Sequence, residues 1–468
     1  MTRLTLATLP GFDTAMRTLA RRPIRRTYLA DPPAGSGLRP VPGDRGLPVV
    51  GAALDALHDV QAMGLARERT YGPVSWCRFF GVRGVIVSGG KGVQHVLTNP
   101  DKVFANAGWE FFIDRFFHRG LMLLDGTEHH SQRRVMQLAF TRPRLAGYVD
   151  RMDPIATTAV NVLPSTEVRL FDGVKQLSLD IATVLFMAGE RGEAQGLQQA
   201  FEACVHAGTA LVRRPVPGLS WSRGLAGRRV LEQHFRAGLT AKRTSDGDDL
   251  FAALCHARTA DGERLSDDDV VNQMIFLMMA AHDTSTITAS AAAYYLARHP
   301  EWQQRVVEEA AEAGDGPLTL SSLDGMTSLD LVLNEAMRLT SAVPALVRRA
   351  VADTEILGYH VPRGCYVVVV PGVDHRLERY WTDPDRFDPE RFAEHRREDK
   401  AHRFAYLPFG GGAHKCIGMH FGRLEVKIIL HRLLRRFQLH LRPDYELTWD
   451  KSSLWFPPDG LPVRLRPR

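Results

Sequence analysis

Two hydrophobic patterns divide the chain. From about residue 90 to residue 340, apolar side chains recur three and four positions apart, with Asp, Ser or Pro at the breaks. That period is typical of amphipathic helices. Two other stretches, "PVSWCRFFGVRGVIVS" around a turn at Gly81 and "ADTEILGYHVPRGCYVVVVP" after residue 350, are strand-like. We therefore predict a mainly α protein with small β-sheets, an α+β fold class.

The most apolar helical stretch runs from Met274 to Ala297 and could be mistaken for a membrane span. His282 and Asp283 lie near its middle, and an acid there costs roughly 2.5 to 3.5 kcal/mol on membrane-insertion scales. We expect a long helix buried inside a soluble protein. A last amphipathic helix is predicted within Ile417–Leu439.

The Pro/Gly-dense stretch Arg39–Gly51 separates a basic N-terminal arm, 1–38, from the rest. No linker interrupts the chain beyond it, so 39–468 is predicted to be a single domain. The arm's "RTLARRPIRR" run fits either a solvated arm or a weak peripheral contact with an anionic membrane surface. We expect the protein to be cytoplasmic, with that peripheral contact left open.

Charge and cysteine usage exclude several classes of protein. The net charge is +6, but basic residues are spread along the chain and matched by acids, which does not indicate a nucleic-acid site. The five cysteines are widely spaced, with no CxxC pair, so neither a disulfide framework nor a zinc cluster is expected. We expect four of them to be plain core or surface residues: Cys77, Cys204, Cys255 and Cys365.

The fifth, Cys416, follows a glycine-rich loop, "FGGGAHKCIG", just ahead of the last predicted helix. Unpaired N–H groups and the helix dipole favour a thiolate there. The loop glycines let the backbone approach something large and flat. A nucleophile, a metal ligand and a buried cysteine after a turn all remain open from this motif alone.

Phe409, Gly412, His414, Cys416 and Gly418 match the Phe-x-x-Gly-x-Arg/His-x-Cys-x-Gly signature, and this stretch resembles the haem-thiolate proteins of the cytochrome P450 family. With further motifs the resemblance extends from about residue 39 to the C-terminus. It implies the cytochrome P450 fold, with haem b held between the long central helix and the cysteine loop. Cys416 is then the axial ligand of the haem iron, a metal ligand.

Three further motifs follow the family's pattern. In "NEAMR", Glu335 and Arg338 match its Glu-x-x-Arg, and the Arg391 of "DPERF" is expected to complete a buried Glu/Arg/Arg network. In "AAHDTS", Asp283 and Thr284 match its acid–alcohol pair, which is expected to relay protons during catalysis. Ala281 stands where the family usually has glycine, so its methyl group is expected to crowd the oxygen groove.

The third motif, "DGTEHHSQRR", places His129 and Arg133 where the family has donors to a haem propionate. Arg348 fits the other propionate position, with Arg349 as the competing choice. His414 is also expected to pair with a propionate, as a group that titrates near neutral pH. The resemblance implies further haem contacts at Phe409, Gly410, Gly418, Ala280 and Ala281.

The resemblance implies a monooxygenase that uses O₂ and two electrons on a large apolar substrate, such as a sterol, terpenoid or fatty acid. Electrons are expected from a separate ferredoxin and its NAD(P)H-dependent reductase, docked on a basic face. The candidate docking residues are Arg134, Lys415, Arg423 and Arg142. The candidate pocket residues are Phe111, Phe112, Phe116, Phe117, Leu346, Leu454 and Trp455.

Alternatives from other classes remain open. A peroxide-driven peroxygenase or a haem-thiolate isomerase would keep the haem without an electron partner. A non-catalytic haem protein would bind a ligand and form no product. His414 and the "AHDTS" run also resemble the sterol 14α-demethylases more weakly, although Asp283 stands where those enzymes commonly have histidine.

Overall fold

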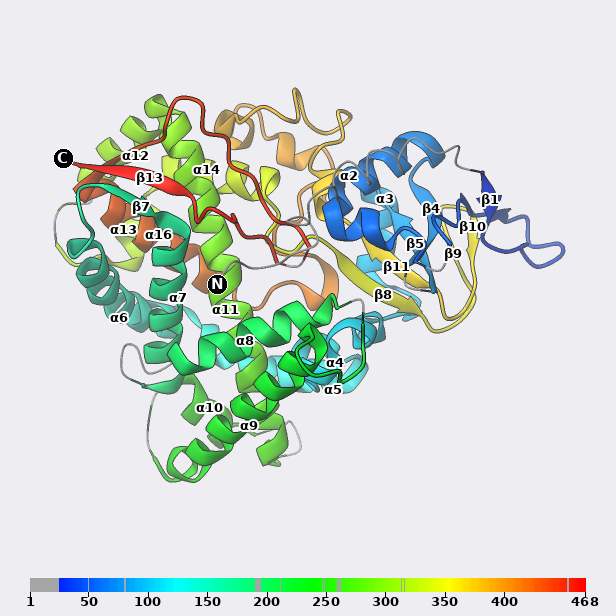
Figure 1. Cartoon of the computed structure of the whole chain (residues 1–468), viewed down its shortest axis with the longest axis horizontal. Helices are drawn as coiled ribbons and strands as arrows, with labels where there is room; N and C mark the ends of the chain where they lie inside the picture. The colour runs from blue at the N-terminus through cyan, green and yellow to red at the C-terminus, as the bar shows by residue number, and fades with distance from the viewer. Residues whose placement is uncertain are drawn as a thin grey trace.

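A single long helix, α11 (Asp267–Arg298), runs through the middle of the helical part of the molecule (Figure 1). The computed structural model describes residues 25–468 except 49, 80, 190–194, 211, 246, 248, 259–261, 313, 315 and 453. Ser266 begins α11 by accepting a hydrogen bond from the Asp269 N–H, and acids fill its first turn, where they complement the helix dipole. His299 and Pro300 end it.

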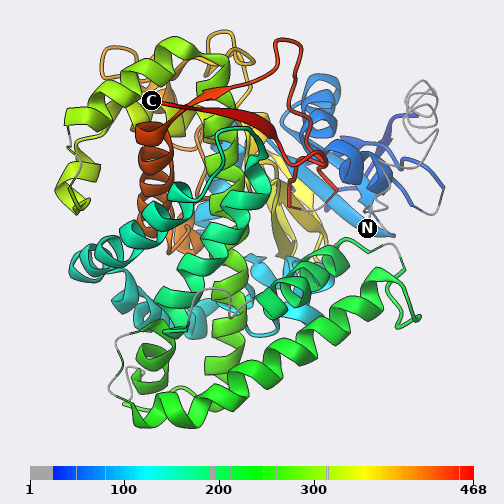
Figure 2. The same cartoon turned by 60° about the vertical axis from the view of Figure 1, so that its left-hand side comes forward.

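The other helices pack around α11 and over the sheets (Figure 1). They are α2 (Ala53–Tyr71), α3 (Gly90–Thr98), α4 (Glu110–Phe117), α5 (Gly126–Gln137), α6 (Arg142–Asn161), α7 (Leu170–Met187), α8 (Gln195–Gly208), α9 (Ser220–Thr244), α10 (Leu250–His256), α12 (Pro300–Glu312), α13 (Leu320–Asp324), α14 (Thr327–Leu339), α15 (Pro371–Asp374) and α16 (Met419–Arg436). Figure 2 shows α9 crossing near one end of α11. Among the described residues, no helix is both long enough and apolar enough to cross a membrane.

The strands form one larger sheet and two small ones. The larger sheet has the order β1-β3-β4-β5-β11-β8-β6, and the small ones are β2-β10-β9 and β12-β13-β7. The strands are β1 (Thr27–Tyr28), β2 (Arg39–Pro40), β3 (Pro42–Gly43), β4 (Val74–Phe79), β5 (Val82–Val87), β6 (Phe104–Ala105), β7 (Glu167–Arg169), β8 (Leu346–Ala350), β9 (Thr354–Ile356), β10 (Tyr359–Val361), β11 (Tyr366–Val369), β12 (Phe437–His440) and β13 (Pro462–Pro467).

The sheet pairing joins distant parts of the chain. The predicted hairpin is confirmed, since β4 and β5 pair antiparallel around Gly81, which has φ +86°. Strand β5 then pairs in parallel with β11, so the segment before the helical region and the one after it share a sheet. This arrangement confirms the predicted α+β class.

Two elements differ from their predictions. Strand β1 lies within the predicted N-terminal arm and pairs with β3; most of the "RTLARRPIRR" run lies outside the described residues. The last helix ends at Arg436, and Phe437–His440 form β12. Polar side chains of α16 are buried as well as apolar ones, because α6, α11 and α12 pack around it, so the helix is not amphipathic as predicted.

Candidate functional site

The glycine-rich loop before α16 presents Cys416 at its end. The backbone N–H of Cys416 donates to the Phe409 carbonyl at 2.9 Å, which closes the loop. Gly410 and Gly412 have φ of +66° and +70°, and a Cβ on Gly412 would collide with the Leu97 carbonyl oxygen. These two glycines are therefore required by the turn itself.

Cys416 is the exposed cysteine of the five, and the four others are buried, as expected of core residues. Burial raises the pKa of the Cys77 and Cys204 thiols to about 12. Although Cys416 keeps exposed surface, partial desolvation of its thiol by the surrounding atoms raises its pKa, against a hydrogen bond from the Gly418 N–H and the charges of Arg133 and Lys415, which favour the thiolate. The N–H effect predicted from the helix start is present, but desolvation outweighs it.

His414 and His129 meet at the side of this loop. Their ring centroids lie 3.9 Å apart at a tilt of 36°. Asn106 Nδ2 lies 2.7 Å from His414 Nδ1, which must accept, and His414 Nε2 lies 3.5 Å from Asp125 Oδ1. Burial lowers the pKa of His414 despite the bond to Asp125, so the ring is neutral at neutral pH rather than half-charged there.

Three cationic or aromatic groups complete this side of the site. The His129 side chain is 1% exposed, and neither ring nitrogen has a partner among the described residues. Arg133 donates to the Lys415 carbonyl at 2.7 Å. Arg348 is buried on β8 and donates to its neighbour's carbonyl, Val347 O, and burial lowers its pKa to about 10.

The alternation of β8 separates the two candidate arginines. Arg348 faces inward, where its charge acts on His414, whereas Arg349 is exposed and stacks toward the Tyr366 ring at 6.0 Å. This placement favours Arg348 for the propionate position.

These residues fit an anionic, planar cofactor. Unpartnered buried nitrogens on His129 and an unpaired buried guanidinium on Arg348 are costly unless an anion satisfies them. A Cβ built on Gly418 meets no protein atom within 4 Å, and one on Gly410 meets only Leu346, so both glycines border open space. A thiol, two guanidinium groups and two imidazoles around that space suit an iron porphyrin with two propionates.

Opposite the loop, α11 carries a half-buried strip in an otherwise buried stretch. Phe276, Ala280 and Thr284 recur every fourth residue and are all half-buried, as is Ala281. The Thr284 hydroxyl donates to the Ala280 carbonyl at 2.9 Å. A Cβ on Gly422 of α16 would lie 3.7 Å from Ser285 Oγ, so α11 packs at Ser285 against the first turn of α16, the helix that follows the cysteine loop.

Asp283 points away from that strip into a cluster of charged side chains. Lys175 Nζ lies 3.3 Å and His282 Nε2 3.5 Å from Asp283 Oδ1, and Lys175 also pairs with Glu202 at 2.7 Å. Burial raises the pKa of Asp283, but His282 and Lys175 outweigh it, so the pKa lies below its usual value. The carboxyl is therefore ionised at neutral pH.

A small cavity of about 20 Å³ lies within this cluster, lined by polar and apolar side chains: Phe171, Lys175, Glu202, Val205, His206, Asp283, Ile287, Leu454, Trp455 and Phe456. A cavity of that size holds one water molecule when polar partners are present. The structure thus places Leu454 and Trp455 beside Asp283.

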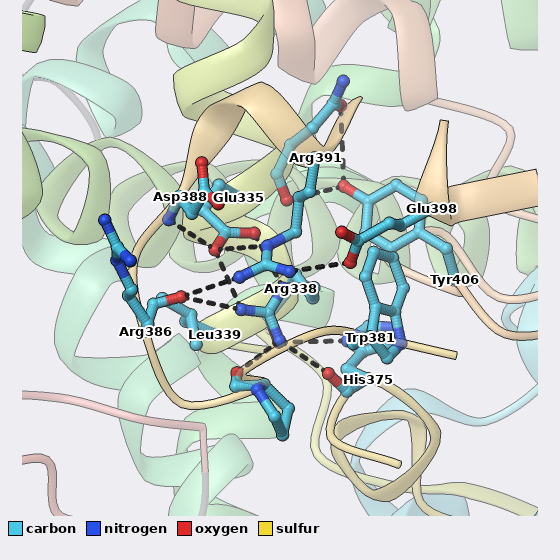
Figure 3. Close-up of polar contacts among 12 residues, drawn as sticks. Glu335, Arg338, Leu339, His375, Trp381, Arg386, Asp388, Arg391, Glu398 and Tyr406 are labelled. Atoms are coloured by element: carbon cyan, nitrogen blue, oxygen red, sulfur yellow. Dashed lines mark hydrogen bonds and ion pairs between the residues drawn. The ribbon is translucent and has the colours of Figure 1, made fainter. Parts of the chain in front are cut away.

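The predicted network is present and fully buried (Figure 3). Glu335 accepts two hydrogen bonds from Arg338, at 2.7 and 2.8 Å, and one from Arg391 at 3.0 Å. All three side chains have no exposed surface. Arg391 also pairs with Glu398 at 2.8 Å. The network ties α14 to the irregular segment that leads to the cysteine loop.

The candidate pocket residues divide into groups. Phe116 and Phe117 are buried in the main core, whereas Phe111 and Phe112 are half-buried and pack edge to face at 5.1 Å. Leu346 lies beside Gly410. The structure therefore brings only Leu346 directly to the cysteine loop.

Several residues around the site were not predicted. Asn106 and Asp125 fix His414, Lys175, Glu202 and His206 surround Asp283, and Glu398 extends the Arg391 network. Glu398 lies seven residues after Arg391 in an irregular segment, and the others lie far along the chain from the residues they contact, so no helical or strand spacing indicates any of them.

Comparisons with known proteins agree with this site. The family described as Cytochrome P450 matches residues 41–205 and 228–461. The Mycobacterium tuberculosis protein named cytochrome P450 136 is 47% identical over 467 residues, 98% of this chain and 95% of that protein. Pentalenene oxygenase of Streptomyces avermitilis is 31% identical over 393 residues, 80% of this chain and 86% of that protein.

A solved structure described as "Retinoic acid bound cyanobacterial CYP120A1" has a TM-score of 0.84 with this chain at 28% identity, covering 91% of this chain and 99% of the other. The cysteine loop, the cationic and imidazole side chains beside it and these matches lead to one conclusion. The chain belongs to the cytochrome P450 family and is a haem b-binding oxidoreductase of the monooxygenase type.

Proposed function

We propose that the enzyme inserts one oxygen atom of O₂ into a large apolar substrate, of the sterol, terpenoid or fatty-acid kind, with electrons from a separate protein donor. One observation carries the proposal. The cysteine loop meets the candidate propionate-binding side chains of α5 and β8, and α16, which follows the loop, packs against α11.

A haem held at this site would supply oxygen activation, and a thiolate ligand would favour O–O cleavage. Cys416 supplies the thiolate. His129, Arg133, Arg348 and His414 hold the propionates, and this role satisfies the otherwise unpartnered nitrogens of His129. The Arg133 bond to the Lys415 carbonyl couples propionate binding to the position of the next residue, Cys416.

Asp283 and Thr284 deliver protons. The Asp283 carboxylate lies at a water-sized cavity that His206 and Glu202, both half-buried, also line. Water in that cavity can pass protons to the carboxylate, and the neighbouring Thr284 belongs to the half-buried strip of α11, the side of the helix that the proposal turns toward bound oxygen. For this step Asp283 must loosen its contact with Lys175, which holds it as a carboxylate.

The apolar substrate rests on two kinds of support. The half-buried rings of Phe111 and Phe112, with Leu346 beside the loop, offer apolar contact near the site. The names of similar proteins point the same way, since pentalenene is a hydrocarbon and retinoic acid is largely one.

Arg134 and Lys415 are the best candidates to meet an acidic electron donor such as a ferredoxin. Both are exposed, and neither has an ion-pair partner among the described residues. Arg142 pairs with Asp324 at 3.1 Å and Arg423 pairs with Asp330 at 2.6 Å. We therefore propose a docking patch centred on Arg134 and Lys415, to which Arg142 and Arg423 contribute less.

The test is a panel of sterols, terpenoids and fatty acids scored by the spin-state shift of the haem. Hits are then incubated with reduced ferredoxin and O₂, or with hydrogen peroxide alone. Hydroxylated product with ferredoxin and O₂ supports the proposal. Product with peroxide alone favours a peroxygenase, and tight binding without any product favours a ligand-binding protein.

A further inference from the structure

An arginine without an acidic partner lies among aromatic rings at the edge of the proposed substrate region. Arg213 belongs to the connection between α8 and α9. Its guanidinium carbon lies 4.2 Å from the centre of the Phe111 ring and 4.9 Å from that of Trp221. Phe111 in turn packs edge to face on Tyr366 of β11 at 6.0 Å. Rings from α4, α9 and β11 thus surround one cation.

The charge of Arg213 is not neutralised by the protein. Its Nη2 donates to two backbone carbonyls, Phe112 O at 3.0 Å and Gly208 O at 3.4 Å. Within the described chain, no carboxylate forms an ion pair with it. Its side chain is half-buried, and burial lowers the pKa of the guanidinium. Cation–π contacts offset only part of the cost of such a site.

The remaining N–H groups are in place for an anion. An arginine has five N–H donors in a planar fork that matches a carboxylate. The two hydrogen bonds to backbone carbonyls use the Nη2 group of Arg213. They hold the guanidinium in one orientation, because they join α4 to the α8–α9 connection. A carboxylate that binds the other edge of the fork requires no rearrangement of this anchor.

The aromatic cluster leads from Arg213 toward the cysteine loop. Phe112, whose ring packs on Phe111, belongs to a hydrophobic cluster with Val347 of β8. The next residue before Val347 is Leu346, which lies beside Gly410. Strand β8 thus lies between the two regions, with Val347 in the cluster of Phe112 and Leu346 beside the loop that ends at Cys416.

We propose that Arg213 binds the carboxylate of the substrate, so that the enzyme takes apolar carboxylic acids, with the hydrocarbon end directed toward the haem. This inference rests on the proposed function and narrows its substrate class. It also predicts that oxidation occurs far from the carboxyl group, because the carboxylate is held at the aromatic edge of the site.

The test compares acids with their alcohols. Isothermal titration calorimetry at about pH 7.5 measures the binding of farnesoic acid, farnesol, palmitic acid and 1-hexadecanol to the haem-loaded protein. The variants are Arg213→Gln and Arg213→Lys, with Arg214→Gln as the matched control, since Arg214 is the exposed neighbour. The thermal midpoint of each variant shows whether it is folded.

We expect the wild-type protein to prefer one or both acids over the matched alcohols. Arg213→Gln should weaken acid binding about tenfold to a hundredfold, the range for a charged hydrogen bond, and change alcohol binding less than about twofold. The affinity of Arg213→Lys for the acids should lie between those of the wild type and Arg213→Gln, because lysine keeps the charge but lacks the planar guanidinium group. Arg214→Gln should bind like the wild type.

Two outcomes contradict the inference, and only the second also contradicts the proposed function. If acids and alcohols bind equally well, or if Arg213→Gln weakens both alike, Arg213 has a structural role and the substrate need not be an acid. If the wild-type protein binds none of the four probes, the proposed apolar substrate is contradicted, and this inference falls with it.

Discussion

The ammonium group of Lys175 on α7 lies 3.3 Å from the carboxylate of Asp283 in the middle of α11. Both side chains are nearly buried, with 12% and 11% of their surface exposed. The buried Asp283 of the long central helix is thus held ionised by a residue that no motif indicates. Removing one partner of such a pair leaves a buried charge uncompensated.

Lys175→Met should therefore lower the free energy of unfolding by about 3 to 5 kcal/mol at neutral pH. The double variant Lys175→Met/Asp283→Asn should recover part of that loss, because the more deeply buried of the two carboxylates that Lys175 pairs with is then removed, and only Glu202 stays without its partner. Thermal midpoints measure both, with the exposed Lys91→Met as control. Strictly additive effects of the two substitutions would show that the residues do not interact.

This loss should depend on pH with a defined sign. The folded pKa of Asp283 lies below its ordinary 3.8, so its ion pair contributes stability above that pH and loses it as pH falls through the folded pKa. The gap between wild type and Lys175→Met should narrow below about pH 4. A stability difference between the two proteins that stays constant below that pH would contradict the assignment.

Glu335→Gln tests the buried network. The substitution leaves Arg338 and Arg391 without their shared carboxylate in a fully buried place, and we expect a loss of about 3 to 5 kcal/mol of stability. Because the network anchors the segment before the cysteine loop, haem content per chain after dialysis should also fall. The exposed Glu378→Gln should change neither quantity. If Glu335→Gln keeps its full haem content, the buried network does not contribute to haem binding.

Charge reversal tests the proposed docking patch. The double variant Arg134→Glu/Lys415→Glu should slow reduction by a ferredoxin about tenfold at low ionic strength, and the difference should shrink as salt screens the charges. Stopped-flow reduction under carbon monoxide measures the rate. Arg142→Glu should have a smaller effect, since Asp324 already pairs with Arg142. Equal reduction rates for the double variant and the wild type would show that Arg134 and Lys415 do not take part in docking.

Glu425 gives a prediction about stability at alkaline pH. It is 1% exposed between α7, α11 and α16, and burial raises its pKa from 4.5 to about 8 despite hydrogen bonds with Ser285 and Ser178. The folded state holds this proton while the unfolded state releases it, so stability falls as pH rises from about 4.5 to 8. Glu425→Gln should remove that fall, which thermal midpoints from pH 5 to pH 9 can show. The control is Glu446→Gln, at an exposed position. If the thermal midpoint of Glu425→Gln depends on pH in the same way as those of the wild type and this control, the prediction for Glu425 is wrong.

The sequence predicted those parts of the site whose chemistry requires fixed local spacing. Glu335 and Arg338 lie three apart on one helical face, and the loop before Cys416 needs glycines at defined positions, so both are visible in a short motif. Lys175 and Glu398 meet their partners only through tertiary packing. Their positions follow from how α7 and the irregular segment pack, and no spacing encodes that.

The same distinction holds for the fold. Helical periodicity and the β4–β5 hairpin were predictable because both are local patterns. The parallel pairing of β5 with β11 and the return of Phe437–His440 to a sheet with β13 were not, since neither pairing is marked by a turn between adjacent strands. The Arg348 position was predicted, but only the alternation of β8 separates it from Arg349.

The most direct test of the account is the carbon monoxide difference spectrum of the reduced protein. Wild-type protein and the buried-cysteine control Cys365→Ala should both show the long-wavelength band of a thiolate-ligated haem. Cys416→Ala should lose that band. If Cys416→Ala binds haem and keeps the thiolate band, Cys416 is not the axial ligand and the account of this site is wrong.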